Sequence, residues 1–274
     1  MNTNRIRVPD FRKMKRRSEK ITMLTAYDAT MARLFDRAGL DALLVGDSLG
    51  MVVLGHETTL PVTLDAMIHH TAAVSRGTER ALVIADMPFL TFQVSVAEAV
   101  RNAGRLMQEG GAAAVKLEGG RPVIEVVTRL VDVGIPVMGH LGVQPQSVHQ
   151  MGGYAKRGTR PQEIDAILAD AVALEQAGAF ALVLESIPSA LALTVTAQVG
   201  IPTIGIGAGP DCDGQVLVSY DMLGLFDRFV PPFVKQYAHL GETVVKAAQE
   251  YVEDVRAGRY PVPVAPAADA PTAS

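Results

Sequence analysis

The feature that most constrains the fold is a unit that recurs along the chain: the end of a helical stretch, a glycine, and then a short apolar run. It occurs at Ala38-Gly39-Leu40, at Gly110-Gly111-Ala112 and at Ala177-Gly178-Ala179. A glycine at that point can take the positive φ that ends a helix, and the apolar run after it predicts a strand. Repeated alternation of strand and helix is typical of a parallel sheet covered by helices.

Eight apolar runs are candidate strands, and most are continuous rather than alternating, as expected of parallel strands buried on both faces. They are Ile21–Ala26, Ala42–Val45, Ala81–Ala85, Ala112–Leu117, Ile135–Met138, Phe180–Leu184, Pro202–Ile206 and Val216–Ser219. Stretches with helical spacing lie between many of them: Ala29–Ala38, Leu64–Arg76, Val96–Gln108, Val123–Val133 and Pro161–Gln176. Eight strands in 274 residues favour a closed (β/α)₈ TIM barrel over an open doubly wound sheet. The interval between Ile206 and Val216 leaves room only for a loop or short turn.

The two ends of the chain differ from this pattern. We expect a single barrel domain over residues 1–260 that includes an N-terminal helical segment and a final helix at Gly241–Ala257, followed by a disordered Pro- and Ala-rich tail at 261–274. The basic residues near the start are interpreted as a solvated helical face or a contact between subunits. They are Arg5, Arg7, Arg12, Lys13, Lys15, Arg16, Arg17 and Lys20.

Composition excludes several classes of function. The net charge of −4 gives no reason to expect nucleic acid or an anionic membrane as a partner. Cys212 is the only cysteine, so neither an intrachain disulfide nor a cysteine-based zinc site is expected. No apolar run approaches the roughly 18 residues that span a bilayer, and the N-terminus lacks the apolar core of a secretory signal. We therefore expect a cytoplasmic protein.

Polar side chains follow the apolar runs, at the points where a barrel carries its catalytic groups. They are Asp47 and Ser48 after the second run, Asp86 after the third, Lys116 and Glu118 at the fourth, His140 after the fifth and Glu185 after the sixth. A charge in such a place is costly to bury without a partner or a metal. In a closed barrel these positions converge on one mouth.

Three of the acids come from consecutive strands and predict a metal site. Asp47, Asp86 and Glu118 supply hard oxygen ligands, which favour Mg²⁺ over zinc. The alternative is that each acid merely caps the helix after its strand, which explains one acid more easily than the whole set. The glycines of Gly205–Gly209 are followed by Pro210 rather than a helix, so we interpret them as an active-site turn and not as a dinucleotide site.

The sequence around these positions resembles the ketopantoate hydroxymethyltransferase family, in order, from about Val8 to Pro261. The motifs that carry the resemblance are Thr25-Ala26-Tyr27-Asp28, Val45-Gly46-Asp47-Ser48-Leu49-Gly50-Met51, Thr59-Leu60-Pro61-Val62-Thr63, Ala85-Asp86-Met87-Pro88-Phe89, Val115-Lys116-Leu117-Glu118-Gly119-Gly120, Gly139-His140-Leu141-Gly142, Gln144-Pro145-Gln146-Ser147, Gly152-Gly153-Tyr154 and Gly205-Ile206-Gly207-Ala208-Gly209. Each motif is weak alone, and their combination is specific.

The resemblance implies a barrel of the phosphoenolpyruvate/pyruvate-like superfamily that assembles as a homo-oligomer, a decamer or an octamer. It implies hydroxymethyl transfer from 5,10-methylenetetrahydrofolate, a co-substrate, to 3-methyl-2-oxobutanoate through a Mg²⁺-stabilised enolate, giving ketopantoate for pantothenate biosynthesis. The implied roles are Mg²⁺ ligands at Asp47, Asp86 and Glu118, substrate contacts at Asp47, Ser48, Asp86, Lys116 and His140, and a general base at Glu185. No motif assigns the folate contacts.

Two other functions remain open at this point. A Mg²⁺-dependent carbon–carbon lyase on a similar barrel would act on a 2-oxo acid by the same enolate chemistry. Such lyases often use a loop cysteine, whereas Cys212 follows the Gly205–Gly209 turn without a histidine or basic neighbour. A non-catalytic barrel that serves as a binding module would not need Lys116 and Glu185 to face each other across the mouth.

Overall fold

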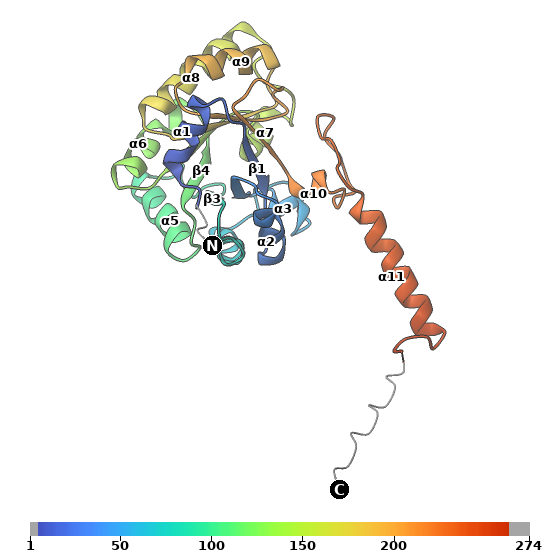
Figure 1. Ribbon diagram of the computed structural model, residues 1–274. Coiled ribbons are helices and arrows are strands. Elements are labelled where there is room, and N and C mark those ends of the chain that lie inside the picture. The colour runs from blue at the N-terminus through green and yellow to red at the C-terminus, as the bar shows by residue number, and fades with distance from the viewer. Residues whose placement is uncertain (1–4, 263–274) are drawn as a thin grey trace.

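Eight parallel strands close into a barrel in the order β1-β2-β3-β4-β5-β6-β7-β8, with β8 paired to β1 (Figure 1). A computed structural model describes this architecture for residues 5–262. The strands are β1 Ile21–Thr25, β2 Ala42–Val45, β3 Leu82–Asp86, β4 Ala114–Glu118, β5 Val137–Gly142, β6 Ala181–Glu185, β7 Thr203–Ile206 and β8 Gly214–Leu217. The (β/α)₈ prediction is therefore confirmed, including the turn rather than a helix between β7 and β8.

Helices surround the barrel and connect its strands. They are α1 Val8–Arg16, α2 Ala29–Arg37, α3 Leu49–Val52, α4 Leu64–Gly77, α5 Val96–Gln108, α6 Ile124–Asp132, α7 Val148–Met151, α8 Pro161–Gln176, α9 Ser189–Gln198, α10 Ser219–Met222 and α11 Leu240–Arg256, with 3₁₀ turns η1 Arg121–Val123 and η2 Pro145–Ser147. Side chains of Asp28, Thr63 and Ser95 accept hydrogen bonds from free backbone N–H groups at the starts of α2, α4 and α5. Such caps explain why these helices begin where they do.

The apolar core has two layers because side chains on a strand alternate between the two faces of the sheet. Residues such as Leu43, Val83 and Leu182 face outward and pack under the helices. Their neighbours, such as Ile84 and Val183, fill the interior of the barrel. The site residues continue this inner layer toward one end.

Helix α1 closes the other end of the barrel, where the strands begin. Phe11 is fully buried there and packs edge-on against Phe180, with 5.5 Å between ring centroids. Lys15 Nζ donates to the Thr196 carbonyl oxygen at 2.8 Å and pairs with Asp213 Oδ2 at 2.9 Å. The interpretation of the basic cluster as a solvated face is therefore wrong for Lys15, which ties α1 to the barrel.

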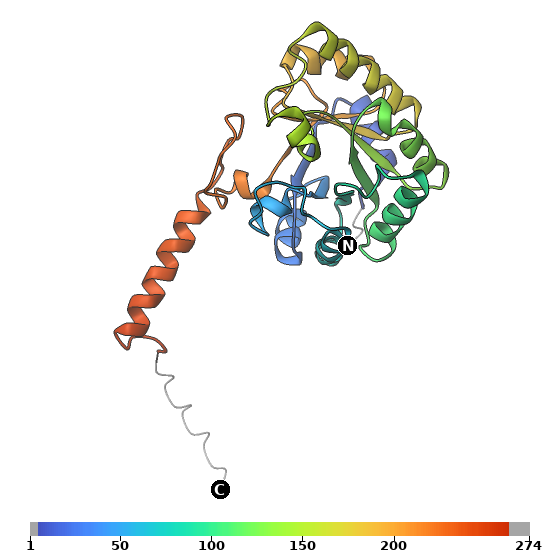
Figure 2. The ribbon, with the colours of Figure 1, turned by 180° about the vertical axis from the view of Figure 1, so that it is seen from behind.

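Residues after α10 form an arm that leaves the barrel. The 17-residue helix α11 points away from it in both views (Figures 1 and 2). No residue of α11 is buried. Its exposed apolar residues, which include Val244, Tyr251 and Val255, recur at helical spacing and form a stripe along one face.

Only β2 has the predicted bounds; the other seven strands differ from the predicted runs at one end or both, and β5 differs most. The fifth run ends at Met138, but β5 continues to Gly142, so His140 lies inside the strand rather than after it. The pattern misses this because the inward residue at the end of the strand is polar. Strand β8 begins two residues before Val216. Among residues 5–262, no helix is both long and apolar enough to cross a membrane. The domain division stays a prediction, and 263–274 lie outside the described residues.

Candidate active site

Strand geometry directs the side chains of the predicted site residues toward the interior of the barrel. In β3, the inward residues Leu82 and Ile84 are followed two positions on by Asp86, which therefore faces the same way. The same alternation turns inward the polar residues of the next three strands, Lys116 and Glu118 of β4, His140 of β5 and Glu185 of β6. Each is placed two or four residues after an inward apolar side chain.

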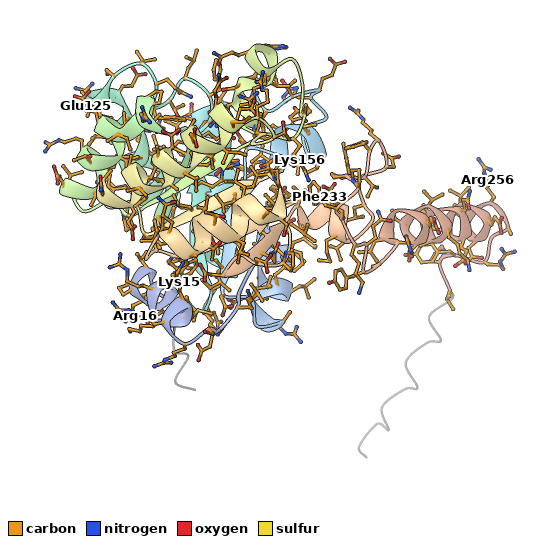
Figure 3. The ribbon with its side chains drawn as sticks, turned by 90° about the horizontal axis from the view of Figure 1, so that it is seen from above. Lys15, Arg16, Glu125, Lys156, Phe233 and Arg256 are labelled. Carbon is orange, nitrogen blue, oxygen red and sulfur yellow. The ribbon has the colours of Figure 1, made fainter. Side chains whose placement is uncertain are left out.

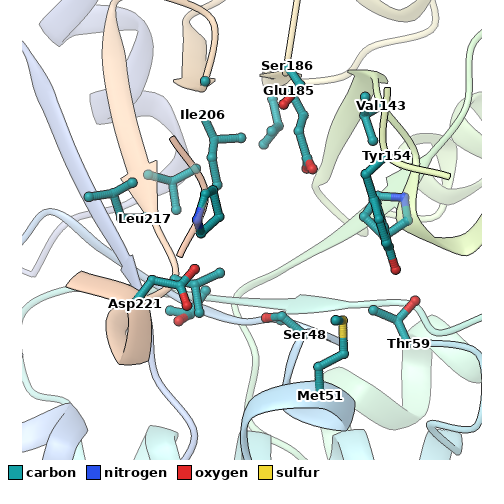
Figure 4. A pocket seen from close by; sticks show the side chains of 18 of the residues that line it. Ser48, Met51, Thr59, Val143, Tyr154, Glu185, Ser186, Ile206, Leu217 and Asp221 are labelled. Carbon is teal, nitrogen blue, oxygen red and sulfur yellow. The ribbon is translucent and has the colours of Figure 1, made fainter. Parts of the chain in front are cut away.

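Strand register then places these residues side by side. Asp86 is paired with Lys116 across β3 and β4, and Glu118 with His140 across β4 and β5. All seven predicted positions, with Asp47, Ser48 and Glu185 among them, line one cavity of about 660 Å³. Figure 4 shows Ser48 and Glu185 on different sides of this cavity. The structure thus brings together every residue that the sequence predicts for the site.

Lys116 occupies the centre of the polar end. Its Nζ lies 2.9 Å from Asp86 Oδ1 and 3.3 Å from His140 Nδ1. Burial opposes the charge on Lys116, but the surrounding carboxylates, Asp86 first, outweigh it and raise its pKa above the ordinary value. Lys116 is therefore a permanent cation at the base of the cavity.

The neighbours of His140 define its tautomer. The pKa of His140 is lowered, mainly by burial and then by the charge on Lys116, so the ring is neutral. A lysine ammonium can only donate, so Nδ1 must carry the lone pair and Nε2 the hydrogen. Nε2 lies 3.2 Å from Glu185 Oε2, although the angle is not yet that of a hydrogen bond. A small rotation would let His140 donate to Glu185.

Gln146 bridges two of the acids, and sequence analysis quoted it in a motif without assigning it to the site. Its side-chain amide donates to Asp47 Oδ2 at 2.9 Å and its backbone N–H to Glu118 Oε2 at 3.1 Å. Burial raises the pKa of Asp47 to about 7, helped by the charge on Asp86. Burial, followed by the charge on Asp47, also raises the pKa of Glu118 well above its ordinary value.

The carboxylates do not enclose a metal ion in their present rotamers. Within residues 5–262, no three His, Cys, Asp or Glu side chains are close enough together to do so. Asp86 Oδ2 accepts from the backbone N–H of Asp47 at 3.0 Å, whereas Oδ1 has only the ionic contact with Lys116 and no aligned hydrogen bond. An oxygen that is buried and incompletely bonded in this way remains available to a ligand.

Gly142 holds the backbone at Glu185. It has a φ of +100°, and a Cβ built on it would collide with the Glu185 carbonyl oxygen. The neighbouring Val143 N–H donates to that same oxygen at 2.9 Å. A larger residue at 142 would therefore displace the strand end that carries Glu185.

The outer part of the cavity contains an acid that sequence analysis missed. Asp221 belongs to α10, directly after β8, and lines the same cavity. It shares the signal of the other acids, a carboxylate just past an apolar run. Nearby, the Gly205–Gly209 turn reaches the cavity through Gly207, in agreement with the predicted active-site turn. Cys212 does not line the cavity; it is buried near the start of β8, and burial raises the pKa of its thiol.

Comparison with solved structures agrees with the barrel fold. The chain is similar to 2,3-dimethylmalate lyase, a PEP mutase/isocitrate lyase superfamily member, with a TM-score of 0.60 and 19% identity over 98% of this chain and 92% of that chain. It is also similar to phosphonopyruvate hydrolase in complex with oxalate and Mg²⁺, with a TM-score of 0.62 and 13% identity over 92% of this chain and 87% of that chain. These likenesses show the fold, a (β/α)₈ barrel.

Sequence comparison is more specific. The family model described as ketopantoate hydroxymethyltransferase matches residues 5–263. The chain is 59% identical over 258 residues to 3-methyl-2-oxobutanoate hydroxymethyltransferase of Moorella thermoacetica, covering 94% of this chain and 96% of that protein. It is 58% identical over 250 residues to the protein of the same name from Syntrophus aciditrophicus, covering 91% and 92%. The chain belongs to the ketopantoate hydroxymethyltransferase family, and the predicted resemblance is confirmed.

Proposed function

We propose that this protein transfers a hydroxymethyl group from 5,10-methylenetetrahydrofolate to 3-methyl-2-oxobutanoate, giving 2-dehydropantoate (ketopantoate) for pantothenate biosynthesis. The observation that carries the proposal is the polar end of the cavity, where Lys116, His140 and Glu185 lie in contact within a member of this family. A buried cation, a neutral imidazole and a carboxylate suit proton removal next to a carbonyl group.

A divalent cation fits the acidic side of the cavity. Asp47, Asp86 and Glu118 are all buried there, whereas Lys116 is the one Lys or Arg among the buried residues of the described chain. Burial first, and then the charge on Asp86, raises the pKa of Asp47. The donors are oxygens, which Mg²⁺ prefers. We propose that these three side chains hold Mg²⁺ after releasing Gln146, and the Mg²⁺-containing phosphonopyruvate hydrolase with the same fold is consistent with this assignment.

In the proposed chemistry, the metal ion activates the substrate and the side chains of the protein orient it. Mg²⁺, when bound, would act as a Lewis acid that draws electron density from the substrate's keto oxygen and makes the C3 proton more acidic. Lys116 places a positive charge beside the substrate's oxygens. Ser48, whose Oγ lies 2.9 Å from the hydroxyl of Tyr27, is positioned to orient the substrate carboxylate.

Glu185 is the proposed general base. Its side chain is 20% exposed and reaches into the cavity, so it can approach C3 while Lys116 holds the oxygens. Glu185 takes the C3 proton, and C3 bonds to the methylene carbon of the donor. The two C–N bonds that hold this carbon in the donor break, and water supplies the hydroxyl oxygen. The two nitrogens of the departing tetrahydrofolate take up the C3 proton, passed on by Glu185, and one proton of the water. His140, neutral and facing Glu185, holds the base in position.

The direct test is product formation. Purified protein is incubated with Mg²⁺, 3-methyl-2-oxobutanoate and 5,10-methylenetetrahydrofolate, and ketopantoate is measured by mass spectrometry. Omitting the folate should abolish the product. A parallel reaction with branched 2-hydroxy and 2-oxo diacids but no folate tests the lyase alternative. Cleavage of such acids without ketopantoate formation would refute the proposal in favour of a lyase, and neither reaction would favour a binding module.

We also propose that the protein is a homo-oligomer, a decamer or an octamer, and that it acts in the cytoplasm. The exposed apolar stripe of α11 supports the first point. In an isolated subunit, Val245 and Val252 of this projecting helix are exposed to solvent, which is unfavourable for apolar side chains. Closed homo-oligomers bury such stripes against copies of the same chain. The cytoplasmic location stays a prediction from the sequence.

A further inference from the structure

The cavity is larger than a small branched oxo acid requires. Its volume of about 660 Å³ is in the range of pockets that hold drug-sized ligands. Away from Lys116 its wall is apolar and largely aromatic, formed by Leu217, Val218, Phe226, Phe229, Pro231 and Phe233. Figure 3 shows Phe233 where the arm leaves the barrel. A Cβ built on Gly207 would lie 2.8 Å from the Phe233 ring, so this aromatic covers the turn after β7. Such a wall suits a flat ring system.

Asp221 is the acid of this outer wall. It is 7% exposed and lines the cavity, and within residues 5–262 its carboxylate takes part in no hydrogen bond or salt bridge. Figure 4 shows it on the opposite side of the cavity from Glu185, with its oxygens toward the centre. Burial raises the pKa of Asp221 to about 6. A carboxylate that is largely withdrawn from water without a protein partner is unfavourable, so a ligand that brings donors into the cavity would gain by binding there.

The three proposed metal-binding acids have protein contacts. Asp86 faces Lys116, and both Asp47 and Glu118 accept hydrogen bonds from Gln146. The hydroxyls of Thr25 and Ser219 contact each other instead: Ser219 N–H donates to Thr25 Oγ1 at 2.9 Å, and the two hydroxyls lie 3.3 Å apart. Asp221 therefore differs from the metal-binding acids both in place and, among the described residues, in lacking any partner.

We infer that Asp221 binds the pyrimidine edge of the reduced-folate donor, accepting from its ring N3–H and its 2-amino group. These two donors are parallel, and a carboxylate can accept both at once. The aromatic and proline side chains that line the same cavity would then contact the faces of the bicyclic ring. This inference rests on the proposed function and adds to it the residue that recognises the one-carbon donor, on the side of the cavity opposite the oxo acid's base.

The first experiment compares Asp221→Asn and Asp221→Ala with Asp227→Asn. Asp227 lies six residues further on, is exposed and does not line the cavity, so its variant removes the same charge from the same segment. We expect both Asp221 variants to raise the KM for methylenetetrahydrofolate and the Kd for tetrahydrofolate by about 10- to 100-fold, because each variant removes hydrogen bonds between the ligand and a charged carboxylate. They should keep the KM for 3-methyl-2-oxobutanoate and the folate-independent exchange of its C3 proton with deuterium. Asp227→Asn should match wild type in every measurement.

A second experiment uses the wild-type protein and therefore does not depend on how the variants fold. A tetrahydrofolate analogue that lacks the 2-amino group should bind wild type at least about tenfold more weakly than tetrahydrofolate, and Asp221→Ala should show no such difference. The inference is overturned if wild type binds both ligands equally, or if Asp221→Asn changes oxo-acid exchange while leaving the folate KM unaltered. The proposed function fails separately, when wild type makes no ketopantoate at all.

Discussion

Nε2 of His140 lies 3.2 Å from Oε2 of Glu185, while the other nitrogen of the same ring lies 3.3 Å from Nζ of Lys116. The imidazole therefore stands between a permanent cation and the proposed base. Because the ring is neutral and its Nδ1 faces an ammonium, Nε2 carries the hydrogen and can donate it to the carboxylate after a small rotation. The three residues come from adjacent strands β4, β5 and β6, so their spacing is set by the sheet.

The first prediction concerns Glu185→Gln, which keeps the size of the side chain but removes its basicity. We expect exchange of the C3 proton of 3-methyl-2-oxobutanoate with deuterium, followed by NMR without folate, to slow by about 10²- to 10⁴-fold. The Kd for the oxo acid should change little, because Lys116 and Ser48 remain. Glu125→Gln is the control, since Glu125 is an exposed residue of α6. Exchange at the wild-type rate in the Glu185→Gln variant would show that Glu185 is not the base, and His140 would be tested next.

The second prediction concerns the metal. Asp86→Ala should raise the Kd for Mg²⁺, measured by calorimetry, and should abolish deuterium exchange. The rise should exceed the roughly 10- to 100-fold that is typical when a residue hydrogen-bonded to a metal ligand is lost, because Asp86 is proposed to bind the ion directly. Wild type treated with EDTA should lose exchange and recover it with Mg²⁺. Asp132→Ala, an exposed acid at the end of α6, should behave as wild type. Full activity in chelator, with no metal found by elemental analysis, would refute the metal site.

The third prediction concerns assembly through α11. Light scattering should give a mass well above twice the 29.1 kDa of one chain. The double substitution Val245→Asp and Val252→Asp charges the apolar stripe and should lower that mass. Thr243→Asp adds a charge on another face of the same helix and should leave the mass unchanged. A wild-type protein that scatters as a 29.1 kDa monomer at working concentration contradicts the oligomer.

The fourth prediction concerns pH and Asp221. Burial raises the pKa of this group to about 6, above the ordinary value of 3.8 that it regains on unfolding. The folded state therefore binds this proton more tightly, so the contribution of Asp221 to the free energy of unfolding falls as pH rises from about 4 to about 6. Asp221→Asn removes that loss and should exceed wild type in unfolding free energy by on the order of 1–3 kcal/mol at neutral pH, but not near pH 4. Melting temperatures measured across this range would show parallel curves if the prediction is wrong.

Much of the fold could be read from local pattern. The runs at Ala42–Val45 and Val96–Gln108 coincide with β2 and α5 because burial on one face or both leaves a short-range signature in the sequence. The end of β5 could not be read in this way, since Gly139 and His140 interrupt the apolar run while their backbone continues to pair with β4 and β6. Strand pairing depends on neighbours in space, and the sequence pattern records only neighbours in the chain.

By itself, the sequence determined the barrel, the family and the set of polar residues that end its strands, because alternation, capping and placement after an apolar run are local properties. Only the tertiary structure decided which of these residues meet. Gln146 reaches Asp47 from 99 positions away, and Asp221 faces the same cavity as Glu185 without a partner among the described residues. The closure of eight strands and the path of the arm create these contacts, and both arise from packing between segments distant in the chain.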